Sequence, residues 1–363
     1  RNADAAYWVL PAADGWVRTV LGSQRQWEGF VKVLGDPEAL AGEEWLQPGF
    51  RLQNSDVVRI VAQDRLTDRT RAQLFDESLE AGTTLGVIHR PSEYVEHPQT
   101  AARGFFDAVE LPDGRRGPLP RAPWRLGEAH APLRRAGEAE DDRPDWSTPS
   151  PWRPAAPAPD APEPALLLDG VRVVEFGVAA VVPELCWILS ELGADVIKIE
   201  SEAHPDPLRQ SGMGHINRGF AFNAECRGRR SVAIDLTTDE GRALALELCA
   251  GADVVAENHR GGVLDDLGLG PDVVSERNPG VVYVASQGYG RGGPYGQMQA
   301  WGPLNSGFAG VHHLWNHPDA PYPCGSSLNH PDHIAGKLVA VAVLAALDRS
   351  RRTGRGTLID MAQ

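Results

Sequence analysis

An aspartate stands where the chain enters its longest helical pattern. Asp332 precedes a run that is apolar at helical spacing as far as Arg349. Asp is a preferred N-cap residue and needs no catalytic role at such a position. The positive end of a helix dipole also favours an ionised carboxylate, which is the state that a carboxylate nucleophile requires. Position alone leaves both interpretations open.

A glycine-rich stretch precedes this helix. Gly288, Gly290 and Gly293 have the spacing G-x-G-x-x-G and follow an apolar run. A dinucleotide-binding turn requires a helix to begin there, whereas Pro294 and polar residues follow. The pattern therefore favours a glycine-rich loop at the carboxyl end of a strand, and such a loop can border a ligand.

Histidines gather near Asp332. Neutral imidazole is a common metal ligand, but the sequence has no H-E-x-x-H motif and no regular ligand spacing. We predict no metal site and expect surface or supporting roles for the five histidines in this region, His312, His313, His317, His330 and His333.

Composition narrows the class of protein. The formal net charge is −14, which argues against nucleic acid or an anionic membrane as the main partner. No apolar stretch reaches the length of a membrane span, and residues 338–347 have the length of a core helix. Four cysteines without a C-x-x-C motif predict no disulfide framework, so a cytoplasmic location is expected.

A change of composition divides the chain into two parts. Residues 138–164 are rich in Pro, Ala and acids, which predicts a semi-rigid linker. The part before it predicts a smaller α+β domain over about 1–95 and a loop-rich return segment over 96–137. The elements expected there are a hairpin over 7–10 and 15–21, helices over 27–34 and 67–80, and a strand over 82–89.

Strands and helices alternate after the linker. This order predicts right-handed βαβ units and a parallel sheet, and therefore a Rossmann-like α/β domain over 165–363. The expected strands are 171–176, 195–200, 231–236, 254–257, 281–286 and 357–361, and the expected helices are 183–192, 239–250 and 332–349.

Several motifs resemble those of one family. Residues 168–363 resemble the N-terminal half of family III CoA-transferases, a group that includes formyl-CoA and carnitine CoA-transferases and alpha-methylacyl-CoA racemase. The matching stretches are LDGVRVVEF (168–176), LGADVIKIE (192–200), RRSVAIDL (229–236), ENHRGG (257–262), NPGVVYV (278–284), DHIAG (332–336) and TGRG (353–356).

The first part of the chain resembles the C-terminal half of the same family. The matching stretches are DGWVR (14–18), GDPE (35–38), VEHPQ (95–99), RGFF (103–106) and PRAPWRL (120–126). The resemblance thus implies the family III CoA-transferase fold with its halves in reversed order. A tandem fusion would produce this order, and the chain would then be a piece of a longer protein. Family members are interlocked dimers, so a homodimer or an intrachain pseudo-dimer is expected.

The resemblance also implies a reaction. The family's catalytic aspartate aligns on Asp332, which would attack an acyl-CoA to give an aspartyl anhydride and then an aspartyl-CoA thioester. Coenzyme A would be a substrate, with no tightly bound cofactor. The residues implied in CoA binding are Ala180, Val181, Asp235, Leu236, Asn258, His259 and Arg260, and the candidates for oxyanion donors are Gly290, Gly292 and Gly293.

Departures from the family pattern keep two alternatives open. Ser201 and Asp266 stand where many members carry basic residues, as expected of a non-catalytic scaffold copy in a tandem protein. Trp301 and Gly302 align with the His and Asp of the racemases. Without a base there, proton abstraction beside the carbonyl has no agent, so racemase activity is disfavoured.

Overall fold

The computed structural model describes residues 7–111, 113–127, 129–130, 166–211, 216–316, 319, 323, 325 and 330–363. The predicted linker over 138–164 and His317 lie outside the described residues.

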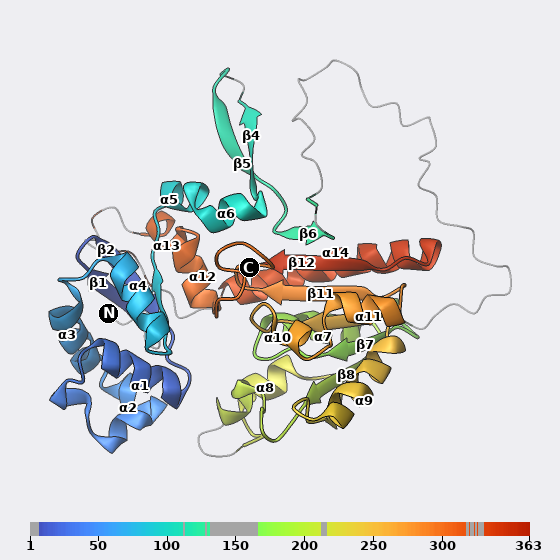
Figure 1. Cartoon of the computed structure of the whole chain (residues 1–363), viewed down its shortest axis with the longest axis horizontal. Coiled ribbons are helices and arrows are strands. Elements are labelled where there is room, and N and C mark those ends of the chain that lie inside the picture. The colour runs from blue at the N-terminus through green and yellow to red at the C-terminus, as the bar shows by residue number, and fades with distance from the viewer. Residues whose placement is uncertain are drawn as a thin grey trace.

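A seven-stranded sheet forms the centre of the larger part (Figure 1). Its strand order is β6-β12-β11-β10-β7-β8-β9, and all neighbours are parallel except β6, which pairs antiparallel with β12 at one edge. The predicted parallel α/β sheet is confirmed. The strands are β6 (Trp124–Leu126), β7 (Arg172–Glu175), β8 (Asp195–Glu200), β9 (Arg230–Ala233), β10 (Val254–Glu257), β11 (Val282–Gln287) and β12 (Thr357–Ala362).

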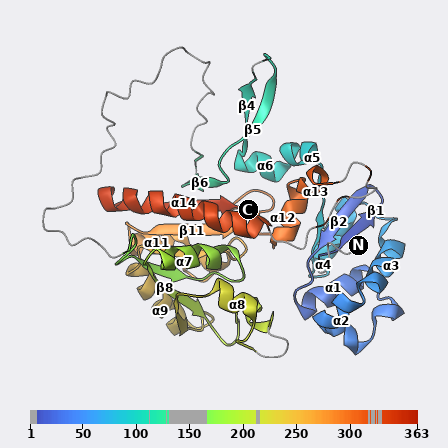
Figure 2. The same ribbon diagram turned by 180° about the vertical axis from the view of Figure 1, so that it is seen from behind.

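Helices cover both faces of this sheet because alternate apolar side chains of its strands point to opposite sides. On one face, Val254 and Val284 pack in a core with α7 (Val181–Glu191) and α14 (His330–Thr353), two helices that lie side by side (Figure 2). On the other face, Val255 and Tyr283 pack in a core with α9 (Asp239–Ala250) and α11 (Pro271–Arg277).

Among the described helices, α14 alone is long and apolar enough to cross a membrane by length and composition. Its residues Ala335, Val339 and Val343 are buried in the core shared with α7 and the sheet. Such burial is typical of a core helix, as the sequence predicts for 338–347.

The smaller part begins with the predicted hairpin, formed by β1 (Val9–Ala12) and β2 (Gly15–Thr19) and extended by β3 (Leu85–Val87). Its core contains Trp8, Trp27, Phe30 and Trp45. Helix α1 (Gln24–Val33) begins three residues earlier than predicted because Ser23 caps it, and α4 (Arg71–Glu80) begins four residues later than predicted because Thr70 caps it. Two helices, α2 (Pro48–Gln53) and α3 (Ser55–Leu66), were not predicted.

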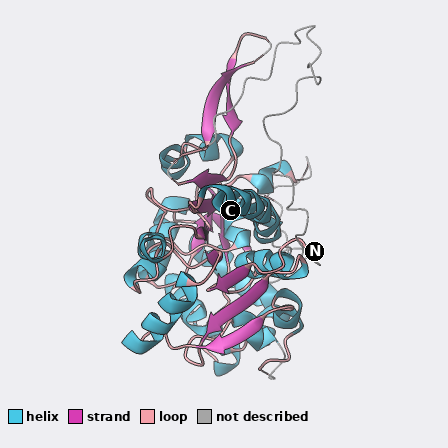
Figure 3. Cartoon of the chain, turned by 90° about the vertical axis from the view of Figure 1, so that its right-hand side faces the viewer, coloured by secondary structure: helices cyan, strands magenta, loops and turns pink. Residues whose placement is uncertain are grey.

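The return segment has more regular structure than predicted. It forms α5 (Pro91–Glu96), α6 (Pro98–Arg103), and a hairpin of β4 (Phe106–Glu110) and β5 (Arg116–Pro120) that projects from the body of the molecule (Figures 1 and 3). The prediction of a loop-rich segment over 96–137 is therefore wrong for the residues of it that the structure describes.

Buried charges attach the return segment to the sheet. Asp360 of β12 accepts hydrogen bonds from Arg103 Nη1 at 2.5 Å and from Arg125 Nη2 at 2.6 Å. Asp360 is 2% exposed and Arg103 is 5% exposed, so this ion pair is part of the interior. Strand β6 and these two arginines make the return segment an integral part of the larger fold.

Helix α12 (Gly302–Phe308) joins the two parts, because it packs against β2 and β3 of the smaller sheet and against α14 of the larger part. Arg18 of β2 also attaches the smaller sheet to this region, because it contacts Ser306 Oγ of α12 at 3.3 Å and His312 Nε2 at 2.5 Å. The packing of α12 on α14 places the starts of these two helices together. Short helices α8 (Phe220–Glu225), α10 (Val263–Asp266) and α13 (Val311–Leu314) complete the fold.

Candidate functional site

The strand order identifies a switch point of the sheet between β7 and β10, where open α/β sheets form a ligand-binding crevice. In chain order from β7, the parallel strands are arranged 3-2-1-4-5-6, so the order reverses between β7 and β10. Ligands of open α/β sheets bind at the carboxyl ends of the strands at such a point. Asn258 links the two turns there, since its Oδ1 accepts from Val178 N at 2.8 Å and its Nδ2 donates to Val178 O at 2.9 Å. The structure thus brings together the predicted residues Ala180, Val181, Asn258, His259 and Arg260.

The turn after β7 is held in an unusual conformation. Ala179 has φ +58°, a left-handed conformation that a non-glycine residue rarely adopts. Its N–H donates to Asp206 Oδ2 at 3.2 Å, and Lys198 Nζ donates to Gly177 O. Strained backbone of this kind is found at ligand-binding turns when the surrounding contacts hold it in place.

A buried ionic network supports the same turn. Lys198 Nζ lies 3.3 Å from Glu175 and 3.2 Å from Asp206, and Arg229 lies 2.8 Å from Glu175. These cations are paired inside the protein. Arg260 is exposed and is the predicted CoA-binding residue best suited to meet a phosphate. Burial lowers the pKa of His259, which favours a neutral imidazole over a phosphate-binding cation.

Two predicted CoA-binding residues lie farther along the sheet. Asp235 and Leu236 follow β9, and β8 separates that strand from β7. Asp235 is exposed, and its Oδ1 accepts from the backbone and the hydroxyl of Thr237. These two residues share the carboxyl edge with the crevice but lie outside its central pair of turns.

Asp332 lies in the first turn of α14, because the helix begins at His330 rather than at the aspartate. The backbone N–H of Gly302, at the start of α12, donates a hydrogen bond to its carboxylate. A β-carbon at residue 302 would lie 2.7 Å from Asp332 Oδ2 and 2.8 Å from Cγ. Only glycine leaves the carboxylate in this place, so the racemase-aligned position 302 has no room for an acid or base.

Electrostatics at Asp332 differ from those of a simple helix cap. Burial raises the pKa of Asp332 to about 7; His333 opposes the rise, and Glu184 and Glu225 add to it. The effect of burial on this pKa therefore outweighs that of the α14 helix dipole, which the sequence analysis expected to favour the ionised carboxylate. A carboxylate with little solvation and a pKa near neutrality is suited to nucleophilic catalysis.

Glu184 is a member of this site that the sequence analysis missed. It is buried, and its oxygens accept from His333 Nδ1 at 2.5 Å and from Lys337 Nζ. Burial also raises the pKa of nearby Glu225. Ligand atoms of Glu184, Glu225 and His333 lie within 4.8 Å of one another, as in a metal-binding group, but Glu184 already carries two donors. The sequence signal that could have identified Glu184 is its position as the single acid within the apolar run 181–189.

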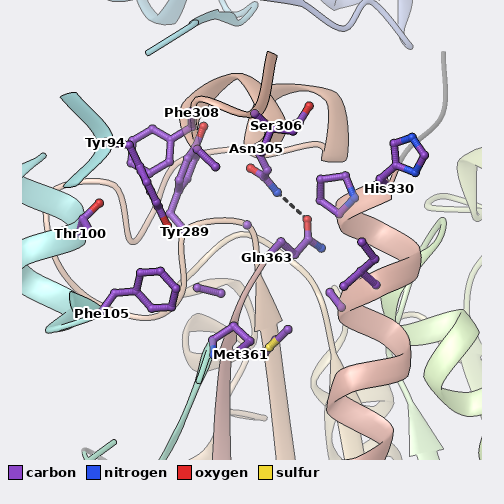
Figure 4. Close-up of a pocket in the computed structure, with 18 of the residues that line it drawn as sticks. Tyr94, Thr100, Phe105, Tyr289, Asn305, Ser306, Phe308, His330, Met361 and Gln363 are labelled. Carbon is purple, nitrogen blue, oxygen red and sulfur yellow. Dashed lines mark hydrogen bonds between the residues drawn. The ribbon is translucent and has the colours of Figure 1, made fainter. Parts of the chain in front are cut away.

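A cavity of about 320 Å³ adjoins the same turn of α14 (Figure 4). Pro331, Ile334 and Ala335 line it, whereas Asp332 lies just outside its lining. Asn305 Nδ2 donates to Gln363 Oε1 at 2.6 Å within it, and Thr100 Oγ1 is a buried polar atom without a hydrogen-bond partner. The rest of the wall is mainly apolar and aromatic, and includes Tyr94, Phe105, Tyr289, Phe308, Trp315, Leu338 and Met361.

The glycine-rich loop borders this cavity through Gly288 and Tyr289. As predicted, no helix begins at Gly293, and the next described helix is α12 at Gly302. Gly290, Gly292 and Gly293 have φ of +72°, +79° and +74°. Gln99 of α6 donates to Tyr289 O at 2.8 Å and to Gly292 O at 3.0 Å, so α6 holds the loop. The backbone donor to the Asp332 carboxylate is Gly302, while the oxyanion role of these three glycines stays a prediction.

Comparisons with known proteins agree with this geometry. A family model described as CoA-transferase family III matches residues 1–138 and 168–363. The chain is 30% identical over 373 residues to a probable CoA-transferase of Mycobacterium tuberculosis, a match that covers 100% of this chain and 46% of that protein. It is 36% identical over 198 residues to the succinyl-CoA–L-malate CoA-transferase alpha subunit of Chloroflexus aurantiacus, covering 54% of this chain and 46% of that protein.

A solved structure shows the same fold over the matched part. The crystal structure of a CAIB/BAIF family protein from Brucella suis matches with a TM-score of 0.51 and 36% identity, over 54% of this chain and 53% of that chain. The chain thus spans about half the length of the curated relatives that it matches.

Proposed function

Because the chain belongs to CoA-transferase family III, we propose that it moves coenzyme A between an acyl-CoA and a carboxylic acid, with Asp332 as the nucleophile. The observation that carries the proposal is the position of Asp332. The Gly302 N–H donates to its carboxylate. The turn of α14 that carries Asp332 adjoins the cavity and lies near the first turn of α7, which begins at the crevice.

The proposed reaction passes through two covalent intermediates. Asp332 Oδ attacks the thioester carbonyl, the C–S bond breaks with its electron pair going to sulfur, and CoA leaves from an aspartyl anhydride. The CoA sulfur then attacks the carbonyl carbon of Asp332, and the first acid departs from an aspartyl-CoA thioester. The acceptor acid repeats these steps in reverse. Covalent relay divides one difficult exchange into easier steps.

The proposed CoA position follows from the strand order. The turns at Ala180 and Asn258 form the crevice where α/β sheets bind ligands. No side chain caps the N-terminus of α7 at Ala180, so its first N–H groups point to a site suited to phosphate. Arg260 is exposed at the same turn and adds a cation that pairs with phosphate.

We place the acyl group in the cavity beside Asp332. Its wall is mainly apolar, and it adjoins the helical turn that carries the nucleophile. An apolar wall also disfavours water near an anhydride that would hydrolyse.

We also propose that the chain is part of a tandem protein with its halves in reversed order. The family model matches on both sides of the proline-rich segment, and one longer relative aligns with the whole chain over 46% of its own length. A homodimer or an intrachain pseudo-dimer would complete the protein.

The second candidate function is a non-catalytic scaffold copy. Ser201 accepts a hydrogen bond from His204 N, and Asp266 is exposed on α10, so neither replaces the cation of other members. Lys198 and Arg229 are committed to buried carboxylates. Weak CoA binding together with an unreactive Asp332 would favour this alternative.

One experiment tests the proposal against its alternative. The protein is incubated separately with acetyl-CoA, succinyl-CoA and benzoyl-CoA, then quenched and examined by intact and peptide mass spectrometry. We expect with at least one of them a CoA adduct on Asp332 that hydroxylamine removes. It should be absent in Asp332→Asn and present in Asp348→Asn, a control exposed on the same helix. Absence of any adduct in the unchanged protein supports the scaffold alternative.

A further inference from the structure

Glu184 and His333 form a pair between two helices beside Asp332. His333 Nδ1 lies 2.5 Å from Glu184 Oε2, and Lys337 Nζ donates to Glu184 Oε1. The Glu184 side chain is 2% exposed, whereas that of His333 is 46% exposed. The pair therefore joins a carboxylate of the interior to an imidazole that a substrate can reach.

Close packing of α7 and α14 creates this arrangement. A β-carbon at Gly336 would lie 3.0 Å from Val181 O and 3.1 Å from Glu184 Cβ, so glycine allows the two helices to approach. As a result, the first turn of α7 at the crevice faces the turn of α14 that carries Asp332 and His333.

The pairing determines which imidazole nitrogen is available. An ionised carboxylate only accepts hydrogen bonds, so Nδ1 of His333 carries the hydrogen directed at Glu184. Nε2 is then the nitrogen left for a substrate. A carboxylate that orients an imidazole in this way is a recurring device for proton transfer at a reacting atom.

Other charges face the same place from each neighbouring helix. Glu184 comes from α7, Glu225 from α8, and Lys337 from α14, while the N–H at Asp332 comes from α12. Lys337 also contacts Glu184 but is 61% exposed, and His333 follows Asp332 directly in the chain. His333 thus adjoins Asp332 in the chain and acts electrostatically on its carboxylate.

We infer that His333 is a catalytic acid–base residue for the CoA sulfur and that Glu184 is the residue that positions it. This inference rests on the proposed function. When Asp332 Oδ bonds to the acyl carbon and the C–S bond breaks, the electron pair goes to sulfur and imidazolium Nε2 gives it a proton. When the sulfur attacks the carbonyl carbon of Asp332, the imidazole takes that proton back, so protons balance over the two steps.

The test measures the rate of adduct formation on Asp332 by rapid quench and mass spectrometry, with the acyl-CoA that labels the unchanged protein. His333→Gln should slow adduct formation at saturating acyl-CoA by roughly 100-fold, in the range of general acid–base catalysis, with the Kd for CoA unchanged. Glu184→Gln should slow it less. Added imidazole should restore part of the rate in His333→Ala, which a merely structural role would not allow.

Lys337→Gln is the matched control, since it removes the other partner of Glu184 and should keep the rate of the unchanged protein. Equal rates in His333→Gln and the unchanged protein overturn the role of His333 while leaving the proposed function intact. If Lys337→Gln is as slow as His333→Gln, the catalytic role of His333 is overturned too, because Glu184, His333 and Lys337 then act only in holding the two helices together. Absence of adduct in the unchanged protein overturns the proposed function itself.

Discussion

The carboxylate of Asp332 lies against the α-carbon of Gly302, so that a β-carbon there would stand 2.7 Å from Oδ2. Two helices meet at this contact, because Gly302 begins α12 and Asp332 is in the first turn of α14. The contact gives the half-buried carboxylate a backbone donor.

Gly302→Ala tests this contact. The new methyl group should push the carboxylate from its place while the fold persists, because a side-chain end can move more easily than backbone. Displacement by about 1 Å lowers catalytic rates by roughly 100-fold, so CoA transfer should fall by that factor. Gly251→Ala is the control, since its β-carbon would have only an ordinary contact of 3.8 Å. Full activity in Gly302→Ala would contradict the proposed role of the contact.

The rate of adduct formation should depend on the protonation of Asp332. Burial raises the pKa of Asp332 to about 7, and only the ionised carboxylate attacks. The rate should therefore rise as pH increases from about 5 to about 7, the range over which the Asp332 carboxylate ionises. A rate that is constant from pH 5 to pH 8 would show that this carboxylate has an ordinary pKa.

Asp360→Asn should destabilise the fold. It leaves Arg103 and Arg125 without their buried counter-charge. Loss of one partner from a buried ion pair costs about 3–5 kcal/mol in the free energy of unfolding, which urea titration would measure. The exposed pair of Asp348 and Arg352 offers a comparison, for which Asp348→Asn should change stability by less than about 1 kcal/mol. Equal effects would mean that the return segment is not attached through Asp360.

Ile334→Trp should narrow the cavity beside Asp332. Ile334 lines the cavity and is 56% exposed, so a larger side chain can be accommodated at its mouth without disturbing the core. We expect kcat/KM for a bulky acyl-CoA such as benzoyl-CoA to fall by about tenfold or more relative to acetyl-CoA. Val341→Trp, on an exposed position of α14 away from the cavity, should leave this ratio unchanged. An unchanged ratio in Ile334→Trp would place the acyl group elsewhere.

Local patterns predicted the elements of the larger part closely. Strand Asp195–Glu200 and helix Asp239–Ala250 have the predicted bounds, because an apolar run and a capped acidic helix start are complete signals in themselves. Helix α3 was missed because only Val58, Ala62 and Leu66 form its buried apolar stripe. The position of Asp332 near a helix start was also predicted, since it depends only on neighbouring residues.

The surroundings of Asp332 could not be predicted from patterns. Glu184 and Gly302 belong to α7 and α12, which reach Asp332 only through packing against α14. The pKa near 7 depends on that packing. Asp360 has partners at 103 and 125, more than 200 residues away, so its strand was predicted but its charge pairing was not.

Transfer of oxygen-18 tests the covalent role of Asp332 most directly. In the proposed reaction, the acceptor acid attacks the aspartyl-CoA thioester, and its bridging oxygen stays on Asp332 when CoA leaves with the new acyl group. An acceptor labelled with oxygen-18 in its carboxylate should therefore leave one labelled oxygen in the Asp332 side chain after a single turnover, as found by tandem mass spectrometry of that peptide. An Asp332 peptide without label after complete turnover would contradict the proposed mechanism.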